Sequence, residues 1–356
     1  MASTVFDPEG EELVGLTYVS DTQPGYRRRK TRSGFRYLNT RGGPISDEGI
    51  VDRIRKLAIP PAWTDIWISP RPDGHLQATG RDAKGRKQYK YHPLWREIRD
   101  GTKYEHTIEF GEALPKIRRQ VEHDLRRHGL PKEKVIATAV SLLDQSLIRV
   151  GNGEYAKTNK SFGLTTLRKK HVGVNGTSLR FEFVGKSGKL HSVTVRNRRL
   201  ARVVKQCQEI RGQELFQYID ENGERQGIDS ADVNAYLRKA AGSDFTAKDF
   251  RTWAGTVLAT HALAEFEPFE TETEAKRNVV DAVKRVATQL GNTPAICRAC
   301  YVHPDVFDLY RDGELAEALR EARGVRRGLD AKESSVLRLL RRERRKAVRR
   351  SGKKAA

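Results

Sequence analysis

Four side chains of this sequence could act together on a phosphodiester, although they lie far apart in the chain. Tyr301 closes the run of residues 292–301, and Arg149, Lys186 and Arg251 precede it in three different local settings. A phenol titrates near ~10 and is a weak nucleophile at neutral pH. It can attack phosphorus when positive charge surrounds the phosphate and donors stabilise the oxygens that gain charge. The set therefore indicates phosphoryl transfer to a tyrosine.

Each of these residues also has an ordinary structural explanation. Most tyrosines pack in proteins with the hydroxyl in water. An arginine at a helix end usually complements the helix dipole, and a lysine in a Gly-Lys-Ser-Gly turn is usually just exposed. Taken singly, each explanation is the better one. Coincidence is a poor account of the whole set, which is spread over about 150 residues of a strongly basic chain.

The composition favours a nucleic-acid partner. The chain has 356 residues, with 67 Lys and Arg against 46 Asp and Glu, which gives a formal net charge of +21. Such an excess attracts polyanions, and nucleic acid is the commonest of them. A basic membrane-surface protein is the main competitor, but no apolar stretch approaches the ~20 residues of a spanning helix, and the first residues do not resemble a signal peptide. We therefore expect a cytoplasmic protein with no membrane partner.

The cysteines predict neither a disulfide framework nor a metal site. There are three of them, which is too few and an odd number. Cys297 and Cys300 form a C-x-x-C pair, but only Cys207 and scattered histidines such as His303 could complete a zinc site. We expect no metal and no other cofactor, and we interpret the pair as two small buried thiols on a helix.

Arg149 and Lys186 fall on elements that the apolar pattern predicts. Residues 135–150 are apolar nearly all round, which predicts a core helix that stops at Gly151 with Arg149 in its last turn. Apolar and polar residues then alternate on both sides of residues 185–189, so Lys186 lies at the tip of a β-hairpin. The Gly-Lys-Ser sequence at this tip is not an ATP-binding loop, because a strand follows it instead of a helix.

Arg251 and Tyr301 fall near predicted helix starts. Thr246 is expected to cap one helix with its hydroxyl, and Lys248 and Arg251, three residues apart, then share a face. A further amphipathic helix ends at Gly291. Thr293 and the proline after it restart the helix as N-cap and first-turn residue, which places Tyr301 about two turns in.

The pattern as a whole predicts an α+β fold. Residues 34–39, 65–69 and 75–79 alternate as strands, and a short helix ending at Leu57 lies between the first two of them. Helical periodicity dominates from about residue 96 onward. The expected parts are a small antiparallel β-sheet domain at residues 1–95, a larger mainly helical catalytic domain with a short β-hairpin at residues 96–310, and a basic C-terminal helix and tail at residues 311–356.

The end of the chain is unusually basic. Between Arg341 and Lys354 nine basic residues stand against one acid. Val336, Leu337 and Leu340 could anchor a helix before this stretch. We expect the basic residues themselves to form a mobile arm that adds non-specific DNA affinity, with a solvated tail of no function as the alternative.

Several short motifs add to this interpretation. They lie at residues 147–152, 163–172, 183–186, 248–251 and 292–301, with Tyr155 between the first two. In order and spacing they resemble the catalytic domain of the poxvirus-type DNA topoisomerases IB that occur in bacteria. Residues 59–63 and 75–89 look like the first domain of the same family. The resemblance covers roughly residues 25–310.

The resemblance implies a monomeric enzyme that clamps duplex DNA between two domains. It would nick one strand by forming a 3′-phosphotyrosyl bond, permit rotation and reseal the strand, without ATP or a metal ion. Tyr301 would be the nucleophile, Arg149 and Arg251 would hold the non-bridging oxygens, and Lys186 would be the general acid. These types suit the chemistry, because the planar fork of arginine matches phosphate and the 5′ oxygen must be protonated as it leaves.

Two further residues take part in the implied site. Asn292 stands where viral members have histidine, and an amide can donate a hydrogen bond but cannot shuttle a proton, so its role would be transition-state stabilisation. Lys248 would help Lys186 to protonate the leaving oxygen. Residues 80–91 interleave cations with tyrosines, which suits contact with a nucleic-acid backbone. The expected DNA-contacting residues are Gln77, Arg81, Lys84, Arg86, Lys87, Tyr89 and Tyr155.

Two other functions remain open at this point. Tyrosine site-specific recombinases use the same nucleophile, but they typically show His-x-x-Arg where this chain has Lys248 and Arg251, and they assemble as multimers on specific sites. A basic DNA-binding protein without catalysis is supported by charge alone. We favour the topoisomerase, acting on duplex DNA in the cytoplasm at the nucleoid.

Overall fold

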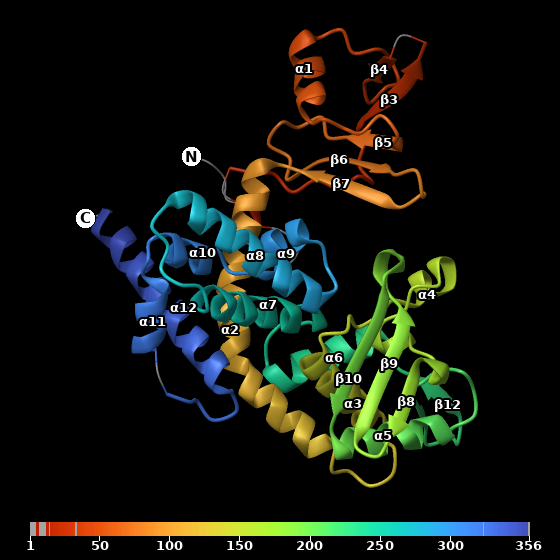
Figure 1. Ribbon diagram of the computed structural model, residues 1–356. Coiled ribbons are helices and arrows are strands. Elements are labelled where there is room, and N and C mark those ends of the chain that lie inside the picture. Colours follow the sequence, from red (N-terminus) through yellow and green to blue (C-terminus); the bar gives the residue numbers. More distant parts are fainter. Residues whose placement is uncertain (1–4, 7–11, 14, 33, 323, 355–356) are drawn as a thin grey trace. The chain divides into compact units, whose positions relative to one another are not determined.

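The protein has an α+β fold, as the pattern predicts, and its chain divides into two compact units (Figure 1). The computed structural model describes residues 5–6, 12–13, 15–32, 34–322 and 324–354. Met1–Tyr104 form the first unit and Glu105–Ala356 the second, which we call the N-terminal unit and the catalytic unit.

The N-terminal unit is built on an antiparallel sheet of five strands in the order β4-β3-β5-β6-β7, drawn in red to orange in Figure 1. The expected strands at residues 34–39, 65–69 and 75–79 are present, and two others were not predicted. The elements are β1 Val5–Phe6, β2 Glu12–Leu13, β3 Tyr26–Thr31, β4 Gly34–Leu38, α1 Glu48–Lys56, β5 Thr64–Ile68, β6 Leu76–Arg81 and β7 Lys87–Tyr91.

Helix α1 covers part of this sheet. Its N-cap is Asp47, whose side chain accepts a hydrogen bond from the N–H of Ile50 at 3.1 Å. Ile54 is buried against Ile66 and Ile68 of β5, which gives the unit a small apolar core. The expected helix is therefore confirmed, with its buried face toward the sheet.

The catalytic unit is mainly helical and has two small sheets, in the orders β10-β9-β8 and β11-β12. Its helices are α2 Pro93–Asp124, which begins in the N-terminal unit, α3 Lys132–Ser146, α4 Gly153–Asn159, α5 Arg198–Glu209, α6 Ser230–Ala241, α7 Ala247–Ala264, α8 Glu272–Leu290, α9 Pro294–Tyr301, α10 Pro304–Arg311, α11 Leu315–Glu321 and α12 Ala331–Lys354. Its strands and 3₁₀ turns are η1 Leu164–Thr166, η2 Lys169–His171, β8 Val172–Asn175, β9 Ser178–Val184, η3 Lys186–Gly188, β10 Leu190–Arg196, β11 Gln217–Ile219 and β12 Arg225–Gly227.

The predicted hairpin is present as β9, the η3 turn and β10. Along β9, Leu179, Phe181 and Phe183 are buried and alternate with exposed neighbours, as a sheet with one covered face requires. The strands pair from Ser178 with Arg196 up to Val184 with Leu190. The turn at the end of this ladder is the one that carries Lys186.

Two elements differ from the prediction. Helix α2 begins at Pro93 and passes through Pro115, whereas the charged, amphipathic pattern of residues 114–128 by itself predicts a helix that begins only at Leu114. Proline normally ends or kinks a helix because it lacks an N–H, so the sequence around Pro115 indicated a start.

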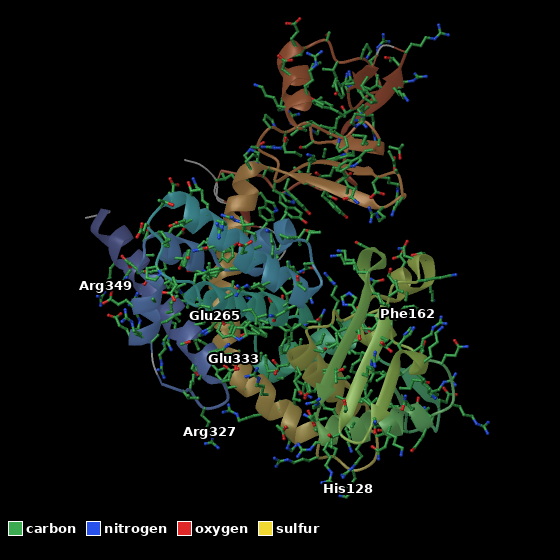
Figure 2. All side chains as sticks on the ribbon, in the orientation of Figure 1. His128, Phe162, Glu265, Arg327, Glu333 and Arg349 are labelled. Atoms are coloured by element: carbon green, nitrogen blue, oxygen red, sulfur yellow. The ribbon has the colours of Figure 1, made fainter. Side chains whose placement is uncertain are left out.

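The basic C-terminal stretch is the second difference, since the expected mobile arm is wrong for the described residues. Helix α12 continues through it to Lys354, and Arg349 of this helix is labelled in Figure 2. Arg341 pairs with Glu112 at 3.1 Å, and Arg344 pairs with Glu105 at 3.6 Å. Neighbouring acids therefore neutralise part of this charge, and the predicted anchors Val336, Leu337 and Leu340 are buried.

No helix in the described part of the chain is both long and apolar enough to span a bilayer.

Candidate active site

Four of the predicted residues come together in the catalytic unit, from four separate segments of the chain. Arg149 donates a hydrogen bond through Nη2 to Oδ1 of Asn292. The guanidinium carbon of Arg251 lies 5.3 Å from the centre of the Tyr301 ring. The structure thus gathers two arginines, an amide and the tyrosine into one cluster, which we call the arginine–tyrosine cluster.

Arg149 reaches this cluster from a loop and not from a helix, so the predicted position in the last turn of a helix is wrong. Helix α3 ends at Ser146, because Leu147 adopts the left-handed conformation with φ of 56°. The loop that carries η1 then holds the extended segment in place. Leu164 donates its N–H to the carbonyl of Arg149 at 2.8 Å, and Thr165 donates to the carbonyl of Val150 at 2.7 Å.

The contact between these two segments needs glycine on both sides. A Cβ atom on Gly163 would lie 2.6 Å from the Cα of Gly151, closer than real Cβ atoms approach. Gly151 itself has φ of 103°, which L side chains rarely adopt. The glycines of the two motifs therefore let the backbones meet, and this meeting fixes the direction of the Arg149 segment.

Arg251 projects from the second turn of α7 and is buried, with 4% of its surface exposed. It donates through Nη1 to the carbonyl of Leu147, and through Nη2 to the carbonyl of Leu290 at 2.6 Å. One guanidinium thus joins the ends of α3 and α8, the helices that precede Arg149 and Asn292. In the first turn of α7, the carboxylate of Asp249 accepts hydrogen bonds from the N–H and the hydroxyl of Thr246. The Thr246 hydroxyl was expected to accept a hydrogen bond from the helix, but here it donates one.

Tyr301 is the last residue of α9, in the place that the sequence predicts. Thr293 caps this helix by accepting from the N–H of Ile296 at 3.4 Å, and proline follows at its first position. The backbone of Tyr301 packs closely on α7, since a Cβ atom on Gly255 would lie 2.3 Å from the Tyr301 carbonyl oxygen. The N–H of His303 also donates to Oγ1 of Thr256 at 3.1 Å. These contacts hold the tyrosine against the helix that carries Arg251.

Asn292 lies between α8 and α9 and is 9% exposed. Gly291 ends α8 in the left-handed conformation, with φ of 60°, and Asn292 donates its N–H to the carbonyl of Ala287 at 2.9 Å. The amide Oδ1 accepts from Arg149, whereas Nδ2 is buried without a hydrogen-bond partner among the described residues.

The cluster is electrostatically unbalanced. Burial, with Arg251 as a further cause, lowers the pKa of Arg149 below its ordinary value, and burial also lowers the pKa of Arg251. Neither guanidinium forms an ion pair with a carboxylate in the part of the chain that the structure describes. The Nε of Arg251 is a second buried donor with no hydrogen-bond partner among the described residues. Buried cations and donors of this kind are costly unless an anion completes them.

The two predicted lysines are not part of the cluster. Lys186 is exposed at the tip of the hairpin, in a turn where Ser187 has φ of 64°. Lys248 is exposed in the first turn of α7, while Arg251 on the next turn is buried. For the predicted role in proton transfer, Lys186 would have to reach the leaving oxygen of a phosphate held in the cluster.

Sequence analysis missed Lys189 and His191, which follow Lys186 and lie beside the cluster. Lys189 donates from Nζ to the carbonyl of Asn292 at 3.2 Å. The ring of His191 stacks on Phe183 with 5.2 Å between centres. Burial, together with Arg149, Arg251 and Lys189, lowers the pKa of His191. A signal was present for His191, because it shares the strand phase of the inward residues Val193 and Val195.

The cysteines beside the tyrosine differ from each other. Cys297 is buried, as predicted, but Cys300 is only partly buried. Burial raises the pKa of the Cys297 thiol to about 11, so it stays protonated near neutral pH and does not compete with the tyrosine as a nucleophile. In the described part of the chain, no three His, Cys, Asp or Glu side chains are arranged to hold a metal ion.

The predicted DNA-contacting residues of the N-terminal unit have two kinds of environment. Gln77 is buried, and its amide donates to the carbonyls of Arg71, Pro72 and Gly74. The others are exposed on β6, β7 and the turn between them, namely Arg81, Lys84, Arg86, Lys87 and Tyr89.

Several of these exposed cations are paired with carboxylates. Arg86 pairs with Asp82 at 2.7 Å, and Lys87 pairs with Asp21 at 2.6 Å. Surface pairs of this kind contribute little to stability, so they leave the cations able to exchange partners. Tyr155 belongs to α4, but its side chain is outside the described part of the structure. DNA contact by any of these residues stays a prediction.

Comparison with known proteins identifies relatives over most of the chain. Residues 92–322 match the family described as eukaryotic DNA topoisomerase I, catalytic core, and residues 34–82 match bacterial DNA topoisomerase IB, N-terminal domain. DNA topoisomerase 1B of Acanthamoeba polyphaga mimivirus is 34% identical over 295 residues, which cover 81% of this chain and 88% of the relative. DNA topoisomerase 1B of Vaccinia virus (strain Copenhagen) is 21% identical over 295 residues, covering 81% and 89%.

Proposed function

Since the chain belongs to the type IB DNA topoisomerases, we propose that Tyr301 is the nucleophile with which this enzyme cuts one strand of duplex DNA. The observation that carries this proposal is the arginine–tyrosine cluster. A buried and a partly buried guanidinium group lie beside a tyrosine without a carboxylate partner among the described residues, and two buried donors there have no acceptor among these residues. A DNA phosphate has the charge and the oxygen acceptors that this cluster lacks.

In the proposed step, the Tyr301 oxygen attacks phosphorus and forms a 3′-phosphotyrosyl bond. The bond from phosphorus to the 5′ oxygen breaks, and Lys186 gives that oxygen a proton, while the phenol proton passes to solvent. Arg149 and Arg251 neutralise the charge that develops on the non-bridging oxygens. Attack by the 5′ hydroxyl in the reverse direction releases the tyrosine and reseals the strand.

Asn292 and Lys248 have secondary roles in this proposal. The unpaired Nδ2 of Asn292 donates to a phosphoryl oxygen, and the Oδ1 keeps Arg149 in place. Lys248 lies in the first turn of the helix that carries Arg251, and it assists Lys186 once DNA is bound.

The reaction exchanges one phosphodiester for another, so it needs no ATP, and the arginines supply the charge neutralisation that other enzymes obtain from metal ions. Strand rotation around the uncut strand before resealing relaxes supercoils of either sign.

DNA is the substrate, and we propose that a monomer encloses it with both units. The exposed residues Arg81, Lys84, Arg86, Lys87 and Tyr89 would contact the backbone from the N-terminal unit, with Gln77 behind them, and Tyr155 would contact it from α4. We retain the functional division into residues 1–95 for DNA contact, 96–310 for catalysis and 311–356 as a basic C-terminal extension. We place the enzyme in the cytoplasm at the nucleoid.

The experiment that tests the proposal compares Tyr301→Phe with Tyr218→Phe, a tyrosine on β11 outside the cluster. Each protein is incubated with supercoiled plasmid and a chelator, and covalent complexes are trapped with denaturant and mapped to a peptide. We expect Tyr301→Phe to lose relaxation and adduct while binding DNA almost normally, and Tyr218→Phe to keep both. An adduct that persists in Tyr301→Phe, or that maps to another residue, would overturn the assignment.

A further inference from the structure

The hairpin that carries Lys186 is attached to the turn between α8 and α9 by two of its side chains. Lys189 donates to the carbonyl of Asn292, and Gly185 donates its N–H to the carbonyl of Lys189 at 2.7 Å, which closes the turn. His191 follows two residues later, on the first part of β10. The segment on which Lys186 depends is therefore joined directly to the cluster that would hold the phosphate.

The ring of His191 fills the space between the hairpin and that turn. A Cβ atom on Gly185 would lie 2.5 Å from Cδ2 of the ring, and one on Gly291 would lie 2.6 Å from its Cε1. One edge of the imidazole thus touches the residue before Lys186, and another touches the residue before Asn292. Both positions are glycine, and any side chain there would displace the ring.

The other surroundings of His191 show that it acts by packing. Its ring lies nearly parallel to that of Phe183, with an interplanar angle of 9°. Its ring nitrogens form no hydrogen bond with any residue that the structure describes. Burial and the neighbouring arginines lower the pKa of the ring and favour its neutral form, so it adds no further charge to a site whose arginines have no carboxylate partner among the described residues.

We propose that His191 is a positioning residue for Lys186: its ring seats the turn end of the hairpin against Gly291, so that the lysine reaches the leaving 5′ oxygen when the phosphate lies in the arginine–tyrosine cluster. This inference rests on the proposed function of Tyr301 and Lys186. Without the ring, the hairpin loses its contact with Gly291 and Lys186 spends less time at the oxygen. Phosphate binding by Arg149 and Arg251 remains.

The test separates proton delivery from phosphate binding by changing the leaving group. Single-turnover cleavage is measured with an ordinary DNA duplex and with one whose 5′ bridging oxygen is replaced by sulfur, because a thiolate leaves without a proton. The variants are His191→Ala, His191→Phe and Lys186→Ala, and the control is His128→Ala, an exposed histidine labelled in Figure 2.

We expect His191→Ala to cut ordinary DNA about 10- to 100-fold more slowly, as displacement of a reacting group by about 1 Å would cause. The sulfur substrate should restore its rate to near that of the wild type, as for Lys186→Ala. His191→Phe keeps the ring without its nitrogens, so it should cut ordinary DNA at close to the wild-type rate, and His128→Ala should be unchanged.

Three results would overturn the inference: an unchanged rate in His191→Ala, a defect that is equally large on the sulfur substrate, or a defect in His191→Phe as large as in His191→Ala. The last would mean that a ring nitrogen takes part directly. Failure of the proposed function is a separate outcome, because the wild type would then form no adduct at Tyr301 on either substrate.

Discussion

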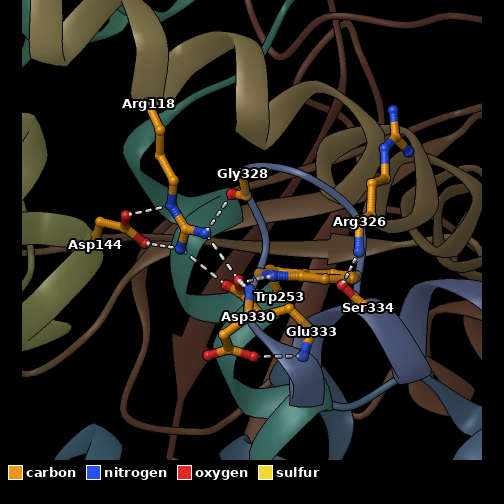
Figure 3. Close-up of polar contacts among 8 residues, drawn as sticks. All are labelled: Arg118, Asp144, Trp253, Arg326, Gly328, Asp330, Glu333 and Ser334. Atoms are coloured by element: carbon orange, nitrogen blue, oxygen red, sulfur yellow. Dashed lines mark hydrogen bonds and ion pairs between the residues drawn. The ribbon is translucent and has the colours of Figure 1, made fainter. Parts of the chain in front are cut away.

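Two clusters in the catalytic unit are built on arginines that are partly or fully buried, and they use the same side chain in opposite ways. Around Arg118 of α2, every guanidinium nitrogen has an acceptor (Figure 3). Asp144 of α3 and Glu333 of α12 provide carboxylates at 2.8–2.9 Å, and Trp253 donates to Glu333 at 3.3 Å. Around Arg149 and Arg251 there is no carboxylate among the described residues, and two buried donors remain without partners.

The pKa shifts show the same contrast between the two clusters. Burial alone would lower the pKa of Arg118, but its hydrogen bonds with Asp144 and Glu333 raise it overall. Burial lowers the pKa of Arg149 and of Arg251, and no carboxylate among the described residues pairs with either of them to offset this. A cluster that the protein neutralises itself ties helices together. A cluster that the protein leaves positive is completed only by an anion from outside, which is what an enzyme acting on phosphate requires.

The largest expected effect is on the stability provided by Arg118, Asp144 and Glu333, which we call the neutralised cluster. Arg118→Met leaves two partly buried carboxylates without their cation, so we expect the free energy of unfolding to fall by about 3 kcal/mol in urea titrations. The matched control adds Asp144→Asn and Glu333→Gln, which removes the unpaired charges and should recover part of the loss. If Arg118→Met alone were as stable as the wild type, the cluster would not tie the helices together.

The arginine–tyrosine cluster, which we also call the reactive cluster in this comparison, should affect catalysis more than stability. Arg149→Ala removes a cation that has no carboxylate partner, so we expect little change in the melting temperature but a loss of about 10²- to 10³-fold in single-turnover cleavage. Arg180→Ala, on the exposed face of β9, is the control and should cleave normally. Arg251→Ala does not separate catalysis from stability as well, since it also removes the hydrogen bonds to the carbonyls of Leu147 and Leu290. If Arg149→Ala lost stability and kept activity, Arg149 would have a structural role and the proposed contrast between the two clusters would be wrong.

One substitution should make the reactive cluster resemble the neutralised one. Asn292→Asp has nearly the same shape and puts a carboxylate next to Arg149 and Arg251. We expect the free energy of unfolding to rise by about 1 kcal/mol, as the melting temperature would report, and cleavage to fall by at least about 10-fold because the carboxylate repels the phosphate. Asn292→Ala, which adds no charge, should lose activity without the gain in stability. Equal melting temperatures for the two variants would contradict this account.

The smallest effect should come from a free anion. Inorganic phosphate that binds at the cluster should stabilise the folded protein by about 1.4 kcal/mol at ten times its dissociation constant. The measurement is the melting temperature in phosphate against chloride at equal ionic strength, and Arg149→Ala should abolish the difference. An equal shift in that variant would place phosphate at another site.

The neutralised cluster also helps to attach helix α12 to the rest of the catalytic unit. Glu333 and the apolar residues Val336 and Leu340 attach α12 to the rest of the catalytic unit, and the basic residues that follow pair with acids on other helices. The match to the topoisomerase I core ends at residue 322, so this helix lies beyond the matched residues. The charge count alone predicted an arm, because it does not show where the neutralising acids lie in space.

Local signals in the sequence predicted the elements that carry the site. The threonine and proline before α9 placed Tyr301 correctly, and strand alternation placed Lys186 at a hairpin tip. Two strands of the N-terminal sheet, β3 and β7, were missed. They are rich in charged residues and lack a clear apolar face, and pairing with the neighbouring strands places them in the sheet.

The sequence by itself determined the types of the reacting groups, the caps and turns next to them, and the family, because each depends on residues that are close together in the chain. Only the tertiary structure decided that α3 stops at Leu147, whose carbonyl accepts from Arg251 across 104 positions, and that Arg149 meets Asn292 across 143. It also decided which arginines are neutralised by carboxylates and which have no carboxylate partner among the described residues. That distinction depends on which segments the folded core brings together, and an arginine has the same donors and charge in either place.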